Sequence, residues 1–139
     1  MNAARPRKRL LVLNHATTRG GASLSLEHLL QSINLSEYDV TVYCRSDRDD
    51  FAVRLESLGF SVIYAGSELT PFAHFSGAEF PARSMSAVAN VWRIVRDSVG
   101  LARVLAKGYD LVVVNSMTLF WAGRLAKLFR CNTALFHRE

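Results

Sequence analysis

Polar side chains that could bind a ligand or move a proton follow three short apolar runs of the sequence. The residues concerned are Asn14 and His15, Asn115 and Ser116, and His137 with the nearby Glu139. Amides and hydroxyls hydrogen-bond a polar ligand, whereas an imidazole or a carboxylate also serves as a general acid or base. Because any strand end must become polar, each residue alone also fits an ordinary turn. Only their convergence would make a site.

A glycine pair in the first loop is a second candidate for chemistry. Gly20 and Gly21 end the segment HATTRGG and precede a helical pattern. Backbone amides at a helix N-terminus bind anions, and glycine lets the ligand approach closely. The fingerprint GxGxxG and the P-loop pattern are both absent from the sequence, so NAD, FAD or ATP binding in those modes is disfavoured. A tight turn between strand and helix explains the glycine pair equally well.

Strand and helix patterns alternate along the chain. Short runs rich in branched apolar residues predict strands at 9–14, 39–44, 60–65, 110–115 and 133–136. Apolar residues at helical spacing predict helices at 22–33, 49–58, 84–107 and 117–129. Such alternation builds a parallel sheet with helices on both faces. The sequence therefore predicts an α/β fold, a Rossmann-like three-layer α/β/α domain whose parallel strands run in the order 3-2-1-4-5.

This topology would bring the polar strand ends together. Ligands of open parallel sheets bind at the carboxyl ends of the strands, near the switch between the first and fourth strands. The segment 66–83 carries two of the three prolines, three phenylalanines and His74, with no clear periodicity. A loop of this length in a compact domain is usually functional or mobile, so His74 joins the candidates.

The net charge of +5 is largely a property of the N-terminus. Its first nine residues hold four cations: Arg5, Arg7, Lys8 and Arg9. The remaining charges are nearly balanced, so no nucleic-acid partner is expected. We expect residues 1–8 to be a disordered basic lead-in and residues 9–139 to form one domain, a size that suits a single core.

The cysteines and the apolar runs indicate a cytoplasmic protein. Cys44 and Cys131 belong to no CxxC or Cys/His cluster, so we expect reduced, buried thiols and no metal site. The apolar stretch from Leu10 to Leu13 is too short for a signal peptide or a membrane span.

Basic residues form a stripe along the longest expected helix. The stripe consists of Arg93, Arg96, Arg103 and Lys107, with Trp92 beside it, and a second basic group lies on the last helix at Arg124, Lys127 and Arg130. Such a surface either docks on anionic lipid or is an ordinary solvated helix face. The apolar stripe of the same helix is Val88, Val91, Trp92, Val95, Val99, Ala102 and Leu105.

In the order and spacing of its motifs the chain resembles the N-terminal domain of retaining, family 4-like glycosyltransferases of the GT-B fold. The motifs are RLLVLNHATTRGGASLSLEHLL, DVTVYC, the third strand GFSVI, YDLVVVNS and the terminal ALFHRE, together covering residues 9 to 139. The resemblance implies transfer of a sugar from a nucleotide-sugar donor to a glycan or lipid-linked acceptor, as in polysaccharide biosynthesis. It implies no cofactor and no metal.

The resemblance also implies roles for particular residues. The loop at Gly20 and Gly21 would lie against the donor diphosphate, and His137 would contact the donor sugar. Acceptor-side candidates are His15, His74, Asn115, Ser116 and Glu139. Membrane-associated members of the family dock basic, aromatic-bearing helices on anionic lipid, which would fit Arg93, Arg96, Arg103, Lys107 and Trp92.

The chain departs from this family in one large respect. Enzymes of the GT-B fold have two Rossmann-like domains with the active site between them, and the nucleotide-binding half has no counterpart in this sequence. We therefore expect the chain to be inactive alone and to need that domain or a partner subunit. A non-catalytic binding domain derived from a truncated transferase is the alternative. A receiver-like signalling module is disfavoured, because Asn14-His15 and Ala65-Gly66 stand where such a module needs aspartates.

Overall fold

The computed structural model describes residues 6–15, 21–45, 48–65, 69 and 84–136. In chain order its elements are β1 (Lys8–Leu13), α1 (Gly21–Ser32), β2 (Tyr38–Cys44), α2 (Asp50–Ser57), β3 (Ser61–Tyr64), α3 (Ser84–Leu105), β4 (Leu111–Val114), the 3-10 helix η1 (Met117–Leu119), α4 (Phe120–Leu128) and β5 (Asn132–Leu135). The strands form one sheet in the order β3-β2-β1-β4-β5, and every neighbouring pair is parallel. The predicted fold class and strand order are confirmed.

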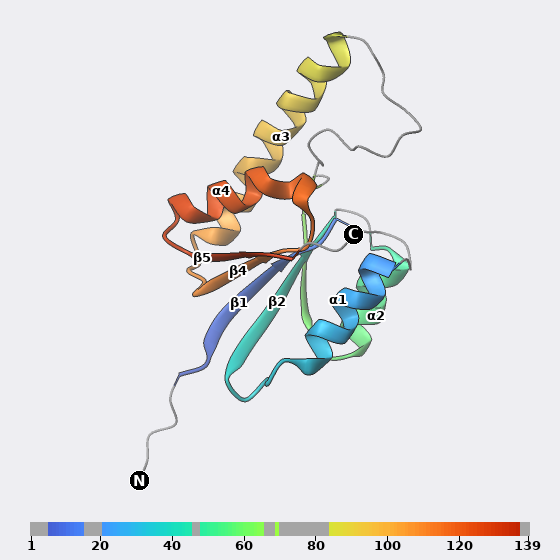
Figure 1. Ribbon diagram of the computed structural model, residues 1–139, viewed down its shortest axis with the longest axis vertical. Coiled ribbons are helices and arrows are strands. Elements are labelled where there is room, and N and C mark those ends of the chain that lie inside the picture. Colours follow the sequence, from blue (N-terminus) through green and yellow to red (C-terminus); the bar gives the residue numbers. More distant parts are fainter. Residues whose placement is uncertain (1–5, 16–20, 46–47, 66–68, 70–83, 137–139) are drawn as a thin grey trace.

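The sheet lies between two helical layers, α1 with α2 on one face and α3 with α4 on the other (Figure 1). Successive side chains of a strand point to opposite faces, so the central strand β1 serves both cores. Leu11 and Leu13 pack in the α3/α4 core, whereas Leu10 and Val12 pack in the α1/α2 core. This burial on both faces explains why the last four residues of β1, Leu10 to Leu13, are an unbroken apolar run.

Helix ends follow the sequence signals closely. Asp49 caps α2 by accepting a hydrogen bond from the Ala52 backbone N–H at 2.8 Å. Gly59 and Gly108 follow α2 and α3 with φ of +87° and +80°, values that only glycine adopts without strain. Strand β1 begins at Lys8, whose N–H donates to the Glu37 carbonyl, so regular structure already includes the last residue of the expected lead-in.

The apolar face assigned to α3 from the sequence is wrong for most of the helix. Figure 1 shows α3 projecting beyond the sheet, so only its C-terminal part packs on the core. The side chains that pack are Asp97, Leu101, Val104 and Leu105. Most of the stripe expected to pack is exposed instead: Val88, Val91, Trp92, Val95 and Val99.

Both cysteines are free and buried, as expected. Among the described residues, no helix combines the length and the apolar character needed to cross a membrane.

Candidate functional site

The carboxyl ends of β1 and β4 form the centre of the candidate site. These strands are neighbours, yet the chain leaves β1 toward α1 on one face and β4 toward α4 on the other. Asn14 and Asn115 follow them directly, and the Asn115 Nδ2 donates to Asn14 Oδ1 at 3.3 Å. Both side chains are buried, with exposed fractions of 1% and 7%. At the topological switch point, therefore, two side-chain amides that lie 101 residues apart in sequence are joined by a hydrogen bond.

The backbone fixes this amide pair. The Asn14 N–H donates to the Tyr43 carbonyl at 3.0 Å, and the Asn115 N–H donates to the Leu13 carbonyl at 3.1 Å. Both residues thus continue the sheet by one ladder bond beyond the strands. Their side chains are held in place before any ligand arrives, which reduces the entropic cost of binding.

Ser116, Asn115 and His15 follow the carboxyl ends of β4 and β1, which are neighbours in the sheet. Ser116 caps η1: its hydroxyl accepts from the Thr118 N–H at 3.2 Å and pairs with the Thr118 hydroxyl at 2.8 Å. His15, half-buried, follows Asn14. The cap orients the Ser116 hydroxyl, and the group remains partly open to solvent.

Helix α1 presents its N-terminus to the same edge. It starts at Gly21, and its first turn carries no acidic residue that would offset the positive end of the helix dipole. A Cβ added at Gly21 would meet no described atom within 4 Å. Glycine at this position is therefore not required by crowding, although its small size leaves the amides accessible.

Cys44 lies beside the amide pair at the end of β2. The residue is buried, with 1% of its surface exposed. Burial raises its pKa to about 12, the negative charges of Asp49 and Glu56 act in the same direction, and a hydrogen bond with the Asn14 side chain opposes the rise. A thiol this reluctant to ionise is a structural group and not a nucleophile.

The Cys44 thiol is expected to resist modification in the native protein. In a Cys131→Ala variant, where Cys44 is the only cysteine, the aromatic disulfide DTNB at pH 8 should react at least about 100-fold more slowly than in urea. The raised pKa also makes the native state lose stability as pH rises from about 9 toward 12, because the unfolded thiol ionises first. Rapid labelling of the native variant would contradict the buried, neutral thiol.

The charged side chains of the α1/α2 layer are engaged with one another. Arg54 donates to the Glu27 carboxylate at 2.9 Å. Glu56 accepts from the Tyr64 hydroxyl at 2.8 Å and from Arg48 at 2.6 Å, and these two bonds lower its pKa. These groups are paired for structure, so none is a candidate acid or base for the edge.

A buried acid near the site was missed by sequence reasoning. Asp97 of α3 is 1% exposed. Burial of Tyr43 is the main cause that raises the pKa of this tyrosine, and the negative charge of Asp97 raises it further. Tyr43 precedes the last residue of β2, so Asp97 reaches toward the carboxyl side of the sheet. A Cβ at Gly100, one turn on, would lie 3.5 Å from the Tyr43 hydroxyl, an ordinary contact distance, so α3 packs directly against this tyrosine. The sequence holds one signal for Asp97: its helical spacing places this acid on the same face of the helix as Leu101, Val104 and Leu105.

The remaining candidates separate into two groups. His137, Glu139, His74 and Gly20 lie outside the described residues. The stripe residues Trp92, Arg93, Arg96, Arg103 and Lys107 are exposed on or just after α3, and the exposed part of α3 stands away from the amide pair. The described residues hold no group of three or more potential metal ligands.

The comparisons with known proteins support the fold. No family model matches the chain, and no curated protein matches it. Among solved structures, the C-terminal domain (residues 78–226) of a hydrogenase from Pyrococcus furiosus is similar with a TM-score of 0.55 and 13% identity, over 94% of this chain and 92% of that one. Identity this low bears on the fold alone. Fold and edge together define the class: a Rossmann-like α/β domain with a polar candidate site at its topological switch point.

Proposed function

We propose that this chain is the acceptor-side domain of a retaining glycosyltransferase of the GT-B kind, which transfers a sugar from a nucleotide-sugar donor. The observation that carries the proposal is the buried Asn14–Asn115 pair at the switch point. The pair fixes the strand ends that carry the partly exposed His15 and Ser116, whose polar groups suit the hydroxyl groups of a glycan. The motif order that resembles the N-terminal domain of family 4-like enzymes supports the same function.

The amide and hydroxyl groups of the edge suit ligand binding and not proton transfer. Asn115 and Ser116 offer neutral donors and acceptors, and the N-terminus of α1 attracts an anion such as the donor diphosphate. An oxocarbenium-like transition state with a diphosphate leaving group needs such dipoles and cations. In the proposal His137 contacts the donor sugar, whereas the nucleotide is held by a second domain or partner subunit.

The proposal that this chain binds the acceptor while a second domain or subunit binds the nucleotide can be tested with the chain alone. The purified chain, incubated with radiolabelled UDP-glucose or GDP-mannose and a bacterial membrane extract as acceptor, is expected to transfer no label above background. It should nevertheless retain acceptor glycans or glycolipids on an affinity column, and Asn115→Leu should abolish retention. Turnover by the chain alone would contradict the half-enzyme proposal. Equal retention by the variant would contradict the edge as the acceptor site.

A non-catalytic binding domain is the second candidate. It is favoured by the described edge itself, where amides and a hydroxyl are oriented to hold a ligand. The genomic context separates the two functions. Continuation of the reading frame, or of the next one, into a second Rossmann-like domain supports the transferase, and its absence supports a binding module.

The surface of α3 suggests where such a protein works: peripherally, on the cytoplasmic face of a membrane. Trp92 and Val88 are 72% and 71% exposed, and they form one apolar stripe with Val91 and Val95. The exposed charges of α3 are arginines, Arg93, Arg96 and Arg103, while its acid, Asp97, is buried. An apolar stripe flanked by cations suits the interface of an anionic bilayer.

Charge reversal on α3 tests this location. The double variant Arg93→Glu/Arg96→Glu is expected to lower co-sedimentation with phosphatidylglycerol-containing vesicles by about tenfold or more, because each cation near such a surface contributes roughly 1 kcal/mol. The matched variant Arg7→Glu/Lys8→Glu, which changes two exposed cations at the start of β1, should bind like the wild type. If the wild type fails to bind anionic vesicles at low salt, the membrane location is wrong.

A further inference from the structure

Strand β5 ends the sheet of the described residues with an open hydrogen-bonding edge. The Asn132 N–H donates to the Asp110 carbonyl at 3.3 Å, and the Phe136 N–H donates to the Val114 carbonyl at 2.8 Å. Backbone groups of a strand point alternately to either side. The N–H and C=O of Thr133 and Leu135 therefore face away from β4, out of the sheet.

The sequence of β5 does not protect this edge. Exposed edges are usually blocked by a charged side chain, a proline or a bulge, and the strand NTAL has neither a charge nor a proline. Ala134 and Leu135 are exposed, Leu135 to 52%. The strand is thus open to pairing with another extended segment.

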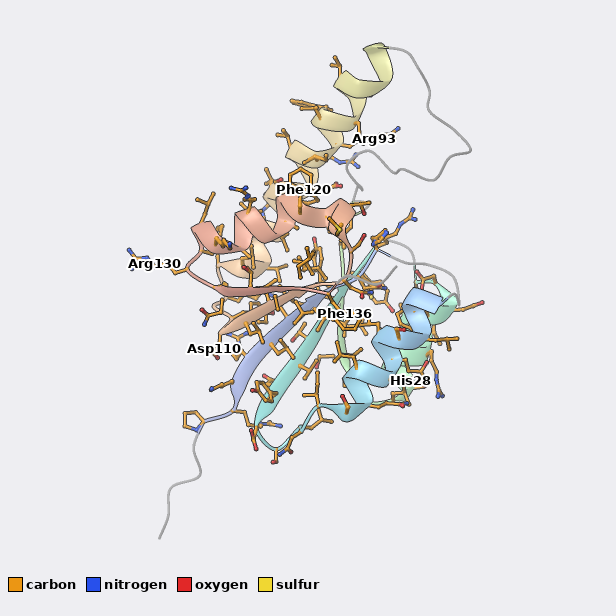
Figure 2. All side chains as sticks on the ribbon, in the orientation of Figure 1. His28, Arg93, Asp110, Phe120, Arg130 and Phe136 are labelled. Carbon is orange, nitrogen blue, oxygen red and sulfur yellow. The ribbon has the colours of Figure 1, made fainter. Side chains whose placement is uncertain are left out.

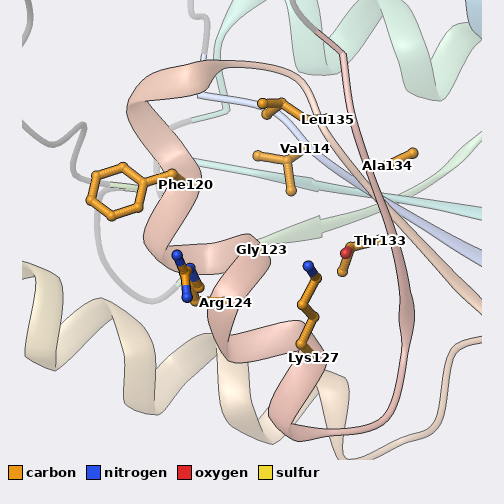
Figure 3. A pocket seen from close by; sticks show the side chains of 8 residues that line it. All are labelled: Val114, Phe120, Gly123, Arg124, Lys127, Thr133, Ala134 and Leu135. Atoms are coloured by element: carbon orange, nitrogen blue, oxygen red, sulfur yellow. The ribbon is translucent and has the colours of Figure 1, made fainter.

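A pocket of about 210 Å³ lies beside the edge, between α4 and β5 (Figure 3). Its lining includes Val114 and Leu135 from the sheet and Gly123 from the helix. A Cβ at Gly123 would lie 3.5 Å from the Val114 side chain, an ordinary contact distance, so α4 packs directly on β4 here. In Figure 3 the Lys127 side chain extends toward Thr133, and Arg124 lies one turn earlier on the helix.

The charge beside the pocket is of one sign. Arg124 and Lys127 line it, and Arg130 follows α4 and points away from the body of the molecule in Figure 2. No acidic residue occurs between Met117 and Phe136. Two-fold pairing of β5 with a second copy would bring these cations together, which disfavours a dimer, whereas an acidic segment would neutralise them.

We propose that the β5 edge binds an extended acidic segment of a partner protein, which adds a strand to the sheet. The added strand would lie about 4.8 Å from β5 and pair with the outward backbone groups of Thr133 and Leu135. Every second side chain would then face α4, and carboxylates at these positions would reach Arg124 and Lys127. This partner site is independent of the glycosyltransferase proposal and lies on a different edge from the amide pair.

A fluorescein-labelled peptide of alternating glutamate and valine, eight residues long, provides the probe for anisotropy titrations with the full chain. Thr133→Pro removes an outward N–H without removing a bond to β4, so it should weaken binding at least about tenfold while the melting temperature is maintained. Thr133→Ala keeps the N–H and should bind within about twofold of the wild type. Arg124→Glu/Lys127→Glu should also lose at least about tenfold, whereas Arg93→Glu/Arg96→Glu should not.

Other results would overturn the proposal. They are absence of binding at millimolar peptide, equal binding of a lysine–valine peptide, and equal binding of a glutamate–valine peptide interrupted by proline. Concentration-dependent dimerisation of the chain that Thr133→Pro abolishes would assign the edge to a second copy instead, and sedimentation velocity detects it.

Discussion

Leu101→Ala is expected to lower the free energy of unfolding by about 3 kcal/mol, because the deleted methyl groups leave a cavity in the α3/α4 core. Leu101 is 0% exposed and belongs to the same buried cluster as Leu11 and Leu13 of the central strand. For a domain of this size the loss corresponds to roughly 10 °C in melting temperature. Urea unfolding followed by circular dichroism measures it.

Val99→Ala is the matched control, two residues away on the same helix. Val99 is 52% exposed and belongs to the stripe that does not pack, so its truncation should change stability by less than about 0.5 kcal/mol. The reverse order of the two effects would mean that α3 is rotated about its axis relative to the structure described above.

Asn14→Ala is the second change with a large expected effect. The substitution removes the acceptor of the buried Asn115 amide and the hydrogen bond to the Cys44 thiol. Buried polar groups that lose a partner cost 1–3 kcal/mol each in typical proteins, so we expect a loss of about 2 kcal/mol. Acceptor binding should fall with it, because the Asn115 side chain is no longer held.

A double-mutant cycle separates the pair from its surroundings. If Asn14 and Asn115 act together, the double alanine variant should be less destabilised than the sum of the single variants, by about 0.5–1.5 kcal/mol. Strict additivity would show that the two amides are neighbours without a functional hydrogen bond.

The sequence predicted the alternation of elements and most of their ends within a residue or two. The reason is physical: the strands are short branched apolar runs, and Asp49, Gly59 and Gly108 mark helix ends with side chains or conformations suited to them. The placement of Asn115 and His15 at the ends of neighbouring strands also followed from topology alone. Parallel strands leave no other place for residues at their carboxyl ends.

The packing face of α3 could not be predicted in the same way. The helix carries two apolar stripes, one with Val91 and Val95 and one with Leu101 and Leu105, and periodicity does not say which of them meets the sheet. The helix also extends past the sheet, so its N-terminal part has nothing to pack against among the described elements. Burial of Asp97 follows from this same rotation and was hidden for the same reason.

The hydrogen bond between Asn14 and Asn115 lay beyond sequence reasoning as well. Its partners come from strands 101 residues apart, and their contact depends on the register in which Leu13 lies opposite Val114. A shift of one residue would turn the side chains to opposite faces. Sequence patterns predict which strands are neighbours, but they do not predict the residue-by-residue register between two strands.

The central claim is that the carboxyl edge around Asn14 and Asn115 binds a sugar acceptor. Amide chemical-shift mapping of the ¹⁵N-labelled chain, titrated with short oligosaccharides and with farnesyl phosphate as a lipid-linked probe, tests it most directly. The account predicts saturable shifts at His15, Asn115, Ser116 and the first turn of α1, weakened at least about tenfold by Asn115→Leu. Shifts confined to α3, α4 or β5, with the carboxyl edge unperturbed by every probe, would contradict it.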